Sequence, residues 1–198
     1  FMIIGDGAAY TAAGNSAGEA QEKAQAWLSR YAYLTGHEWS DSLQVMTYGA
    51  VAPQPADVPA VEIGASLGDE VELVGFDLPD SIWDPGDVIP LTLFWRGVEP
   101  VGADYTVFVH LLSQDGQVVA QSDGTPVGGY EPTSGWQQGE LVVDRRGVRL
   151  PDALPSGDYV LWVGMYSPAT GERLPVRDND GELQGDSIWL GTIIVAAP

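Results

Sequence analysis

From residue 71 to its end, the chain alternates short apolar runs with clusters of turn-forming residues, and this pattern constrains the fold more than any other feature. In residues 88–96, Leu91, Leu93 and Trp95 alternate with their neighbours, as in a strand that buries one face. Close spacing of such runs is typical of an all-β sandwich. The predicted strands are 71–78, 88–96, 105–113, 117–123, 140–150, 158–167 and 188–196.

The turns between these runs indicate antiparallel pairing. Gln114-Asp115-Gly116 separates the third and fourth predicted strands and carries the Asp-Gly pair of a tight hairpin. We therefore predict a mainly β protein in which residues 61–198 form an antiparallel immunoglobulin/fibronectin-like β-sandwich.

Residues 1–51 differ in pattern and predict a small α/β unit of the strand-helix-strand type, a fragment of a larger domain. A helix is expected over 17–34, with Trp27, Leu28 and Tyr31 on one face and Gly36 as its stop. A strand at 43–48 follows, and the crossover would be right-handed if the two strands were parallel. This unit is too small to close a core alone, so it must complete a sheet or pack on the sandwich.

Residues 52–60 are rich in proline and predict a linker between the two parts. Proline fixes φ and removes a backbone donor, so it stiffens the path between modules without joining a sheet.

The charge of the chain argues against two classes of partner. Acidic residues number 28 against eight basic ones, for a net charge of −20. Nucleic-acid affinity comes mainly from Lys and Arg that displace counterions, so nucleic acid is not an expected partner, and an anionic lipid surface is equally unsuited. Apolar runs of about eight residues are far shorter than the roughly 20 that a membrane-spanning helix needs, so no direct membrane insertion is expected.

The residue types needed for catalysis are sparse. The only histidines are His37 and His110, no G-x-S-x-G elbow is present, and no pair among the scattered acids stands out. His110 lies inside a predicted strand, where a hydrogen-bonded or half-exposed histidine is the simplest expectation. We predict no catalytic residue and no enzyme activity in this chain.

The long Gly/Pro/Thr-rich segment from Ser122 to Gly139 is the predicted binding loop. It carries Tyr130 and Trp136, whose rings could stack on the apolar face of a sugar, and Glu131 and Gln137, which could hydrogen-bond its hydroxyls. The alternative is that the loop folds back and buries its aromatic rings. Four other tryptophans are expected in core or edge packing, namely Trp83, Trp95, Trp162 and Trp189.

A weaker pattern in the sequence indicates a possible metal site. Asp178 and Asp180 lie in an oxygen-rich Asp-Asn-Asp-Gly-Glu segment that suits calcium. An EF-hand would need a carboxylate where Trp189 stands, so a solvated loop and a calcium site of another type both remain open. No other cofactor is expected.

A set of short segments resembles the C-terminal extracytoplasmic region of bacterial glycosyltransferase family 39-like membrane proteins, which are relatives of the dolichyl-phosphate-mannose protein mannosyltransferases. The segments are Ala26 to Tyr33, His37-Glu38-Trp39, Leu43 to Tyr48, Leu73-Val74-Gly75-Phe76, Tyr105 to Leu112, Ser122 to Gly139, Leu150-Pro151 and Tyr159 to Pro175.

That resemblance implies a parent protein that transfers a sugar from a polyprenyl-phosphate donor. The family's catalytic acids lie in membrane-associated loops that this chain lacks, so no catalytic residue carries over. The chain would be a non-catalytic extracytoplasmic accessory domain, tethered to the cell membrane through a missing N-terminal region. Its expected partners are a glycan or acceptor and the membrane-embedded part of its own chain. The alternatives are a free-standing carbohydrate-binding module and a structural protein-binding surface domain.

Overall fold

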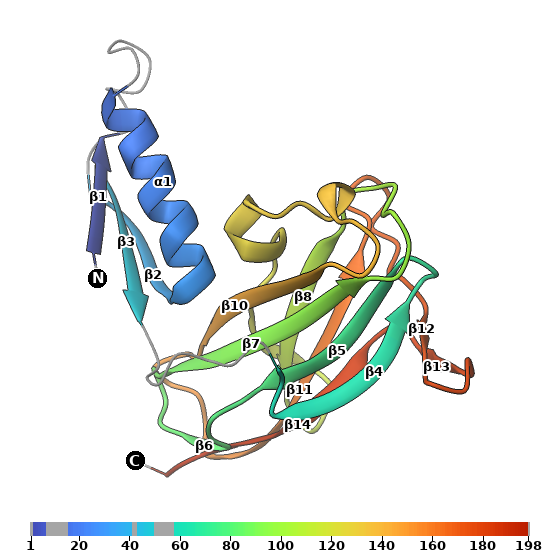
Figure 1. The fold of residues 1–198 in the computed structure, drawn as a ribbon. Helices are drawn as coiled ribbons and strands as arrows, with labels where there is room; N and C mark the ends of the chain where they lie inside the picture. Colours follow the sequence, from blue (N-terminus) through green and yellow to red (C-terminus); the bar gives the residue numbers. More distant parts are fainter. Residues whose placement is uncertain (1, 7–15, 41–42, 50–57, 198) are drawn as a thin grey trace.

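The computed structural model describes residues 2–6, 16–40, 43–49 and 58–197. It consists of an N-terminal unit, with one helix on a three-stranded sheet, beside a larger β-sandwich (Figure 1). The N-terminal elements are β1 (Met2–Asp6), α1 (Ser16–Tyr31), β2 (Tyr33–Ser40) and β3 (Leu43–Gly49). The sandwich contains β4 (Val61–Leu67), β5 (Val71–Asp77), β6 (Ile82–Trp83), β7 (Val88–Gly97), β8 (Thr106–Leu112), β9 (Val118–Gln121), the 3₁₀ turns η2 (Pro126–Gly129) and η3 (Thr133–Gly135), β10 (Leu141–Arg149), β11 (Gly157–Tyr166), β12 (Val176–Arg177), β13 (Leu183–Gly185) and β14 (Ile188–Val195).

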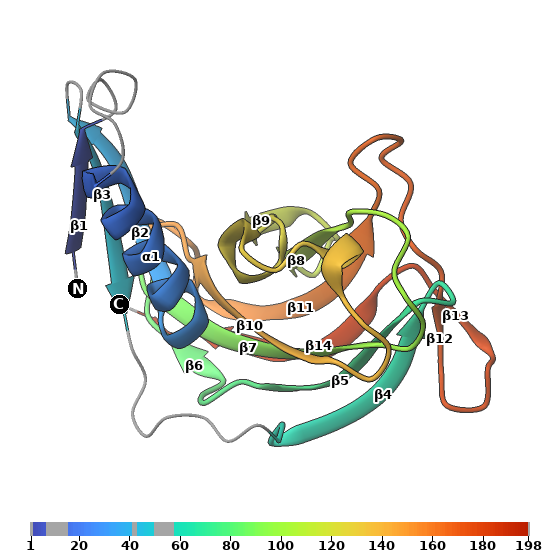
Figure 2. The same cartoon turned by 45° about the horizontal axis from the view of Figure 1, so that its top comes forward.

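The sandwich consists of two curved sheets (Figure 2). One has the strand order β10-β7-β5-β4-β12-β13 and the other the order β6-β14-β11-β8-β9. Pairing is antiparallel except where the two-residue strand β6 runs parallel to β14. Alternate side chains of both sheets meet between them and exclude water, among them Leu93, Trp95, Val107, Leu111 and Leu161. Each such side chain stabilises the fold by roughly 1.5–3 kcal/mol through burial.

The predicted mainly β, antiparallel sandwich is confirmed. All seven predicted strands are present, with ends that differ by at most two residues from the prediction. The predicted hairpin is also present, because β8 pairs antiparallel with β9, and Gly116 adopts a φ of 80° in the turn between them. Glycine suits that position because a side chain would strain a backbone with positive φ.

One detail of the strand prediction is wrong, because β7 buries both of its faces over Leu91 to Trp95. On its outer face, the Thr92 hydroxyl lies 2.7 Å from the Tyr33 hydroxyl of the N-terminal unit. An alternating sequence pattern indicates that one face of a strand is buried. A second unit that packs on the sheet can bury the other face as well.

The N-terminal unit differs from its prediction in two respects. The helix ends at Tyr31 instead of residue 34, and Gly36 lies within a strand, β2, at a register shift against β3. The sheet has the order β1-β3-β2 and is antiparallel throughout, so there is no parallel crossover. Aromatic and β-branched residues just after the helix favour a strand over another helical turn.

Most of the predicted linker, residues 52–57, lies outside the described residues. Its last residues, 58–60, lead directly into β4, which the sequence pattern did not predict. The described part of the chain contains no helix that is both long and apolar enough to cross a membrane.

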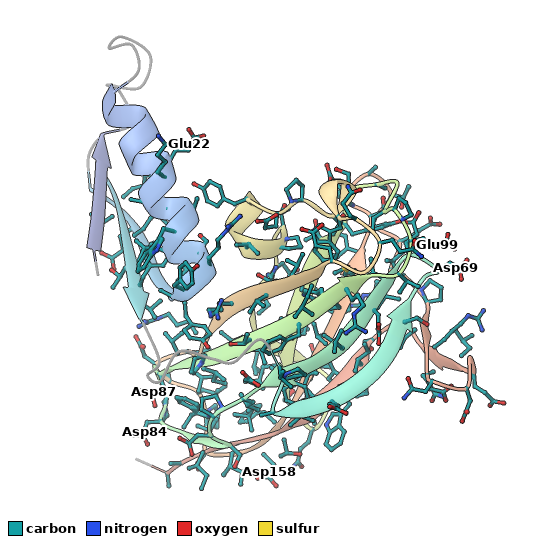
Figure 3. The ribbon with its side chains drawn as sticks, in the orientation of Figure 1. Glu22, Asp69, Asp84, Asp87, Glu99 and Asp158 are labelled. Carbon is teal, nitrogen blue, oxygen red and sulfur yellow. The ribbon has the colours of Figure 1, made fainter. Side chains whose placement is uncertain are left out.

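Apart from the buried Asp144, many of the described acidic residues lie around the periphery of the molecule. Figure 3 shows several of them at strand ends and turns and one on α1, with side chains that point outward; those labelled are Glu22, Asp69, Asp84, Asp87, Glu99 and Asp158. Their separation agrees with a role in solubility and turn chemistry.

Candidate binding site

The N-terminal unit packs on the outer face of β7 and β10, and this junction contains the cavities of interest. Strand β10 is an edge strand, so α1 and β2 cover one end of the six-stranded sheet. The close approach depends on Gly147, where an added Cβ would lie 2.4 Å from the Leu34 carbonyl oxygen. A larger residue at this position would push the two parts of the protein apart.

A cavity of about 210 Å³ lies between α1, the segment after η2, and β10. It combines charged groups, one aromatic ring and aliphatic walls, which is the usual make-up of a site for a small polar ligand. Its lining residues are Arg30, Tyr31, Val127, Glu131, Glu140, Leu141, Val142, Val143 and Arg145. We call this cavity the junction cleft.

The charged groups of the junction cleft balance one another. Arg30 forms an ion pair with Glu131, and the Arg145 guanidinium donates a hydrogen bond to the backbone carbonyl of Arg30. Glu140 supplies a second carboxylate and also accepts a hydrogen bond from the Gln137 backbone N–H at 2.9 Å. Two cations and two anions therefore face one small volume, and all four can hydrogen-bond hydroxyl groups.

An exposed aromatic pair extends from the junction cleft along α1. Trp27 and Tyr31 are one helical turn apart, their ring centroids are 5.1 Å apart, and they are 55% and 42% exposed. Only Leu28 of the predicted apolar face is buried. Large aromatic surface beside a cleft is unusual for side chains that serve only in packing.

The predicted binding loop places its residues in different environments. Trp136 is 1% exposed and belongs to the core. For this residue, the alternative in which the loop folds back and buries its aromatic rings holds. Its indole N–H donates to the backbone carbonyl of Glu131 at 3.1 Å, which holds Glu131 at the rim of the junction cleft. Gln137 is exposed, and its side-chain amide donates to the Gly135 carbonyl.

Tyr130 is half-buried and lies at a neighbouring cavity of about 190 Å³. Its hydroxyl donates a hydrogen bond to the Gln25 side-chain carbonyl, at 3.2 Å, so it links the loop to α1. Tyr130 and Glu131 thus lie together at the junction, whereas Trp136 and Gln137 do not line its cavities.

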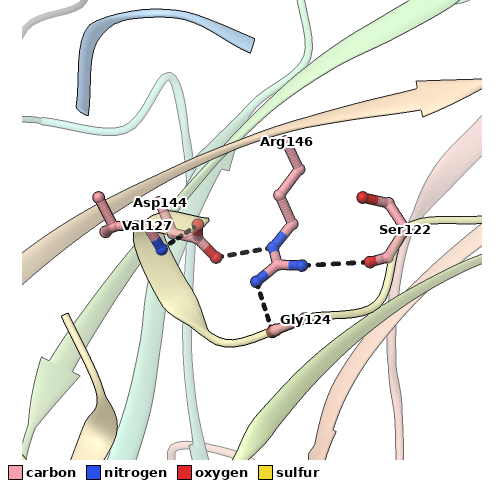
Figure 4. Close-up of polar contacts among 5 residues, drawn as sticks. All are labelled: Ser122, Gly124, Val127, Asp144 and Arg146. Carbon is pink, nitrogen blue, oxygen red and sulfur yellow. Dashed lines mark hydrogen bonds and ion pairs between the residues drawn. The ribbon is translucent and has the colours of Figure 1, made fainter. Parts of the chain in front are cut away.

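A buried ion pair fixes the loop behind the junction cleft (Figure 4). Asp144 and Arg146 are 2.7 Å apart and almost fully buried, and Arg146 donates to the carbonyls of Ser122 and Gly124. The other oxygen of Asp144 accepts the backbone N–H of Val127 at 2.8 Å.

Val127 has a φ of 53°, which is rare for a β-branched residue. Such strain persists only where the surroundings over-determine it, and it is most common at functional sites. Here the Asp144 hydrogen bond and burial of the valine side chain hold the strained residue in the wall of the junction cleft.

Five residues of the site were not predicted as functional, among them Arg30 of α1 and Glu140, which lies just after the predicted binding loop. Trp27 and Tyr31 were assigned to the buried face of the helix, and Arg145 carried no signal because it lies in an ordinary strand. The aromatic pair was visible in the sequence as a spacing of four residues, but its exposure depends on the way the N-terminal unit docks.

The two histidines lie far apart along the chain and in different settings. His110 is in β8, and its imidazole lies 3.3 Å from the Asp123 carboxylate with the side chain 15% exposed, so it is a partly buried strand histidine beside an acid. His37 is exposed in β2, beside the ring of Trp39.

The candidate calcium residues lie in the loop between β12 and β13. The Asp178 carboxylate accepts backbone N–H groups from Asp180 and Glu182 and a side-chain N–H from Gln184. These hydrogen bonds lower the pKa of Asp178, and the one from the Glu182 backbone N–H has the largest effect. Within the described residues, no group of three or more His, Asp or Glu side chains could hold a metal ion.

Comparison with known proteins gives little that bears on function. No family model matches the chain, and no curated protein matches it. The fold is similar to the crystal structure of the C-terminal domain of Wzt, with 13% sequence identity, a TM-score of 0.47, and coverage of 71% of this chain and 83% of that one. Since no family model matches, the resemblance to glycosyltransferase family 39-like proteins stays a prediction.

Proposed function

We propose that this chain is a non-catalytic carbohydrate-binding region and that the junction cleft is its binding site. The observation that carries the proposal is the exposed Trp27–Tyr31 pair, which continues into a cleft lined by two guanidinium and two carboxylate groups.

Sugars present both kinds of surface that such a site can recognise. The axial C–H groups of a pyranose form an apolar face that stacks on an aromatic ring, and its hydroxyls form charge-assisted hydrogen bonds with carboxylates and guanidinium groups. Tyr31 belongs to both the cleft and the aromatic pair, so the two kinds of surface adjoin.

The charge pattern favours an uncharged sugar. Arg30 and Arg145 are offset by Glu131 and Glu140, and the molecule as a whole carries a net charge of −20. An anionic glycan would meet this repulsive field without a surplus of cations to offset it.

The cellular setting is part of the same proposal. As an extracytoplasmic accessory domain of a membrane glycosyltransferase-like protein, the chain would hold the acceptor glycan while the membrane part performs the transfer. Support for this setting comes only from the sequence resemblance, and a search of the full reading frame for hydrophobic helices tests it.

Glycan-array screening followed by calorimetric titration tests the binding function. Tyr31→Ala and Trp27→Ala should each weaken binding of an array-positive glycan by roughly tenfold, since a lost aromatic contact costs about 0.5–1.5 kcal/mol beyond the lost burial. Trp39→Ala is the matched control, because Trp39 is 62% exposed in the same unit and lines none of the junction cavities. No binding at millimolar sugar, or equal losses in all three variants, would contradict the proposal.

A further inference from the structure

The outer face of the five-stranded sheet carries a row of side chains that the junction cleft does not involve. Trp162 of β11 is paired in register with Trp189 of β14 on one side and with His110 of β8 on the other. His110 is paired in turn with Gln121 of β9. Partners in register point to the same side of a sheet, so these four side chains form one continuous row.

The row lies on the outside of the sandwich. Trp189 is 56% exposed, Trp162 is half-buried and Gln121 is exposed, whereas their neighbours Leu161 and Leu190 point into the core. The tryptophans therefore contribute little to the core, although they stand in regular strands.

The row changes character from one end to the other. Two indole rings occupy the β14 and β11 end, and His110 and Gln121 offer hydrogen bonds at the β8 and β9 end. The Asp123 carboxylate lies 3.3 Å from His110 and adds an acceptor there. Three interstrand steps of about 4.8 Å make the row roughly 14 Å long, which exceeds the width of one sugar ring.

We propose that this row is a second carbohydrate site, one that binds an extended, uncharged polysaccharide chain laid across the strands. The proposal rests on the carbohydrate-binding function proposed above and adds to it the ligand's form: a linear chain of several sugars, bound along its length.

Charge decides between this occupant and a second copy of the protein. Two copies would each bring a net charge of −20, and their repulsion opposes a shared apolar face. An uncharged polysaccharide meets no such repulsion, and its sugars offer both an apolar face for the two indoles and hydroxyls for the polar end of the row. None of the four paired side chains lines the three cavities described at the junction, although Asp123 lines one of them. The row is therefore an open platform that would bind internal sugars as well as chain ends.

Calorimetric titration of the whole chain with cellohexaose and mannohexaose tests this site. Trp189→Ala should weaken binding of the preferred hexaose by roughly tenfold, and Trp189→Phe should restore most of the affinity because it keeps an aromatic face. Trp39→Ala again controls for the loss of an exposed tryptophan elsewhere. In ¹⁵N-labelled protein, the indole N–H signals of Trp162 and Trp189 should shift on titration.

The outcomes separate the two sites. If Tyr31→Ala weakens hexaose binding while Trp189→Ala does not, the row is not a binding site and the junction cleft stands. If only Trp189→Ala weakens hexaose binding, the row is confirmed and the hexaose does not bind in the cleft. Failure of the wild type to bind either hexaose would overturn the row, as would sedimentation showing a dimer that Trp189→Ala dissociates.

Discussion

At the scale of single residues, Trp136 acts on the junction cleft through packing and one hydrogen bond. Its ring lies in the core and its indole N–H holds the Glu131 carbonyl. Trp136→Ala should therefore reduce the free energy of unfolding by about 3–5 kcal/mol, the usual cost of removing a buried aromatic ring. Trp136→Phe should lose less and stay folded, which allows its sugar binding to be measured.

Chemical denaturation and titration together test this role. A ligand that stacked directly on Trp136 would lose affinity strongly in Trp136→Leu, which removes the aromatic face. We expect only a modest loss in that variant, due to the freed Glu131 carbonyl. An alanine variant as stable as the wild type would contradict the buried placement.

The Asp144–Arg146 pair should be sensitive to removal of one partner. Asp144→Ala leaves a buried guanidinium without its counterion and the Val127 N–H without its acceptor, and such losses cost about 3–5 kcal/mol. Arg149→Ala is the matched control, because its contact with Asp152 is exposed and surface changes stay within about 0.5 kcal/mol. Urea denaturation measures both, and similar losses in the two variants would contradict the assignment.

At the scale of elements, sequence patterns located the strands that alternate cleanly and missed those that do not. In β4, Gly64 has a positive φ and falls at a register shift, which breaks the alternation between Glu62 and Ala65. The strands β6, β12 and β13 have only two or three residues, too few to show a period. For such elements, pairing with neighbours decides the structure.

The binding loop shows the same limit for the site. Its composition marked it as functional, and it does place Tyr130 and Glu131 at the junction. Which of its aromatic rings is buried depends on the core behind it, because Trp136 and Tyr130 have the same local signals. Local sequence therefore indicated the segment but could not assign a role to each residue.

The turn between β12 and β13 gives a prediction on pH. Backbone N–H groups, Glu182 first, hold the pKa of Asp178 below its ordinary value of 3.8. A lowered folded-state pKa adds stability above the ordinary value, and that stability is lost as pH falls through the folded pKa. Asp178→Asn should therefore lower the melting temperature at pH 7. The difference in melting temperature from wild type should shrink as the pH falls below 3.8, the ordinary pKa of the group.

Asp180→Asn is the control, since Asp180 contributes its backbone N–H to the turn. A calcium-dependent rise in melting temperature that Asp178→Asn abolishes would instead support a cation in this loop. A constant difference between wild type and Asp178→Asn across the acid range would contradict the pKa argument.

The contact between β2 and β10 gives a prediction on docking. Gly147→Ala places a Cβ 2.4 Å from the Leu34 carbonyl and 2.8 Å from a Val88 methyl, so the N-terminal unit must move away. Faster hydrogen exchange over residues 33–40 with unchanged exchange in β8 and β11 is expected. Gly135→Ala is the control, because nothing lies within 4 Å of its Cβ, and equal exchange in both variants would contradict the tight approach.

At the scale of the whole molecule, the two parts have separate cores. Among the described residues, the buried side chains of the sandwich core come from Ala65 onward, with Ile63 packed against them, whereas Leu28, Ala32 and Tyr48 form a second, small cluster with Met46. Hydrophobic burial within one core is what makes unfolding cooperative. The predicted division into residues 1–51 and 61–198 can therefore be tested by removing the smaller part.

A chain that begins at residue 58 should fold into the sandwich and unfold in one cooperative transition. It should lose some stability, since removal of Tyr33 exposes Thr92 and uncovers part of the outer face of β10. The truncation removes Trp27, Arg30 and Tyr31 but leaves Trp162 and Trp189 in place. Binding at the junction cleft should therefore disappear, and hexaose binding along the tryptophan row should persist.

Circular dichroism, calorimetry and titration of the truncated chain distinguish these effects. A molten or aggregated product would mean that the N-terminal unit is needed for the sandwich to fold, because the uncovered outer face of β7 and β10 then meets water or other chains. A folded product that binds the array-positive glycan as tightly as the full chain would show that α1 contributes nothing to the site. A folded product that binds hexaoses but not that glycan would assign one ligand to each surface, since only the row remains intact without the N-terminal unit.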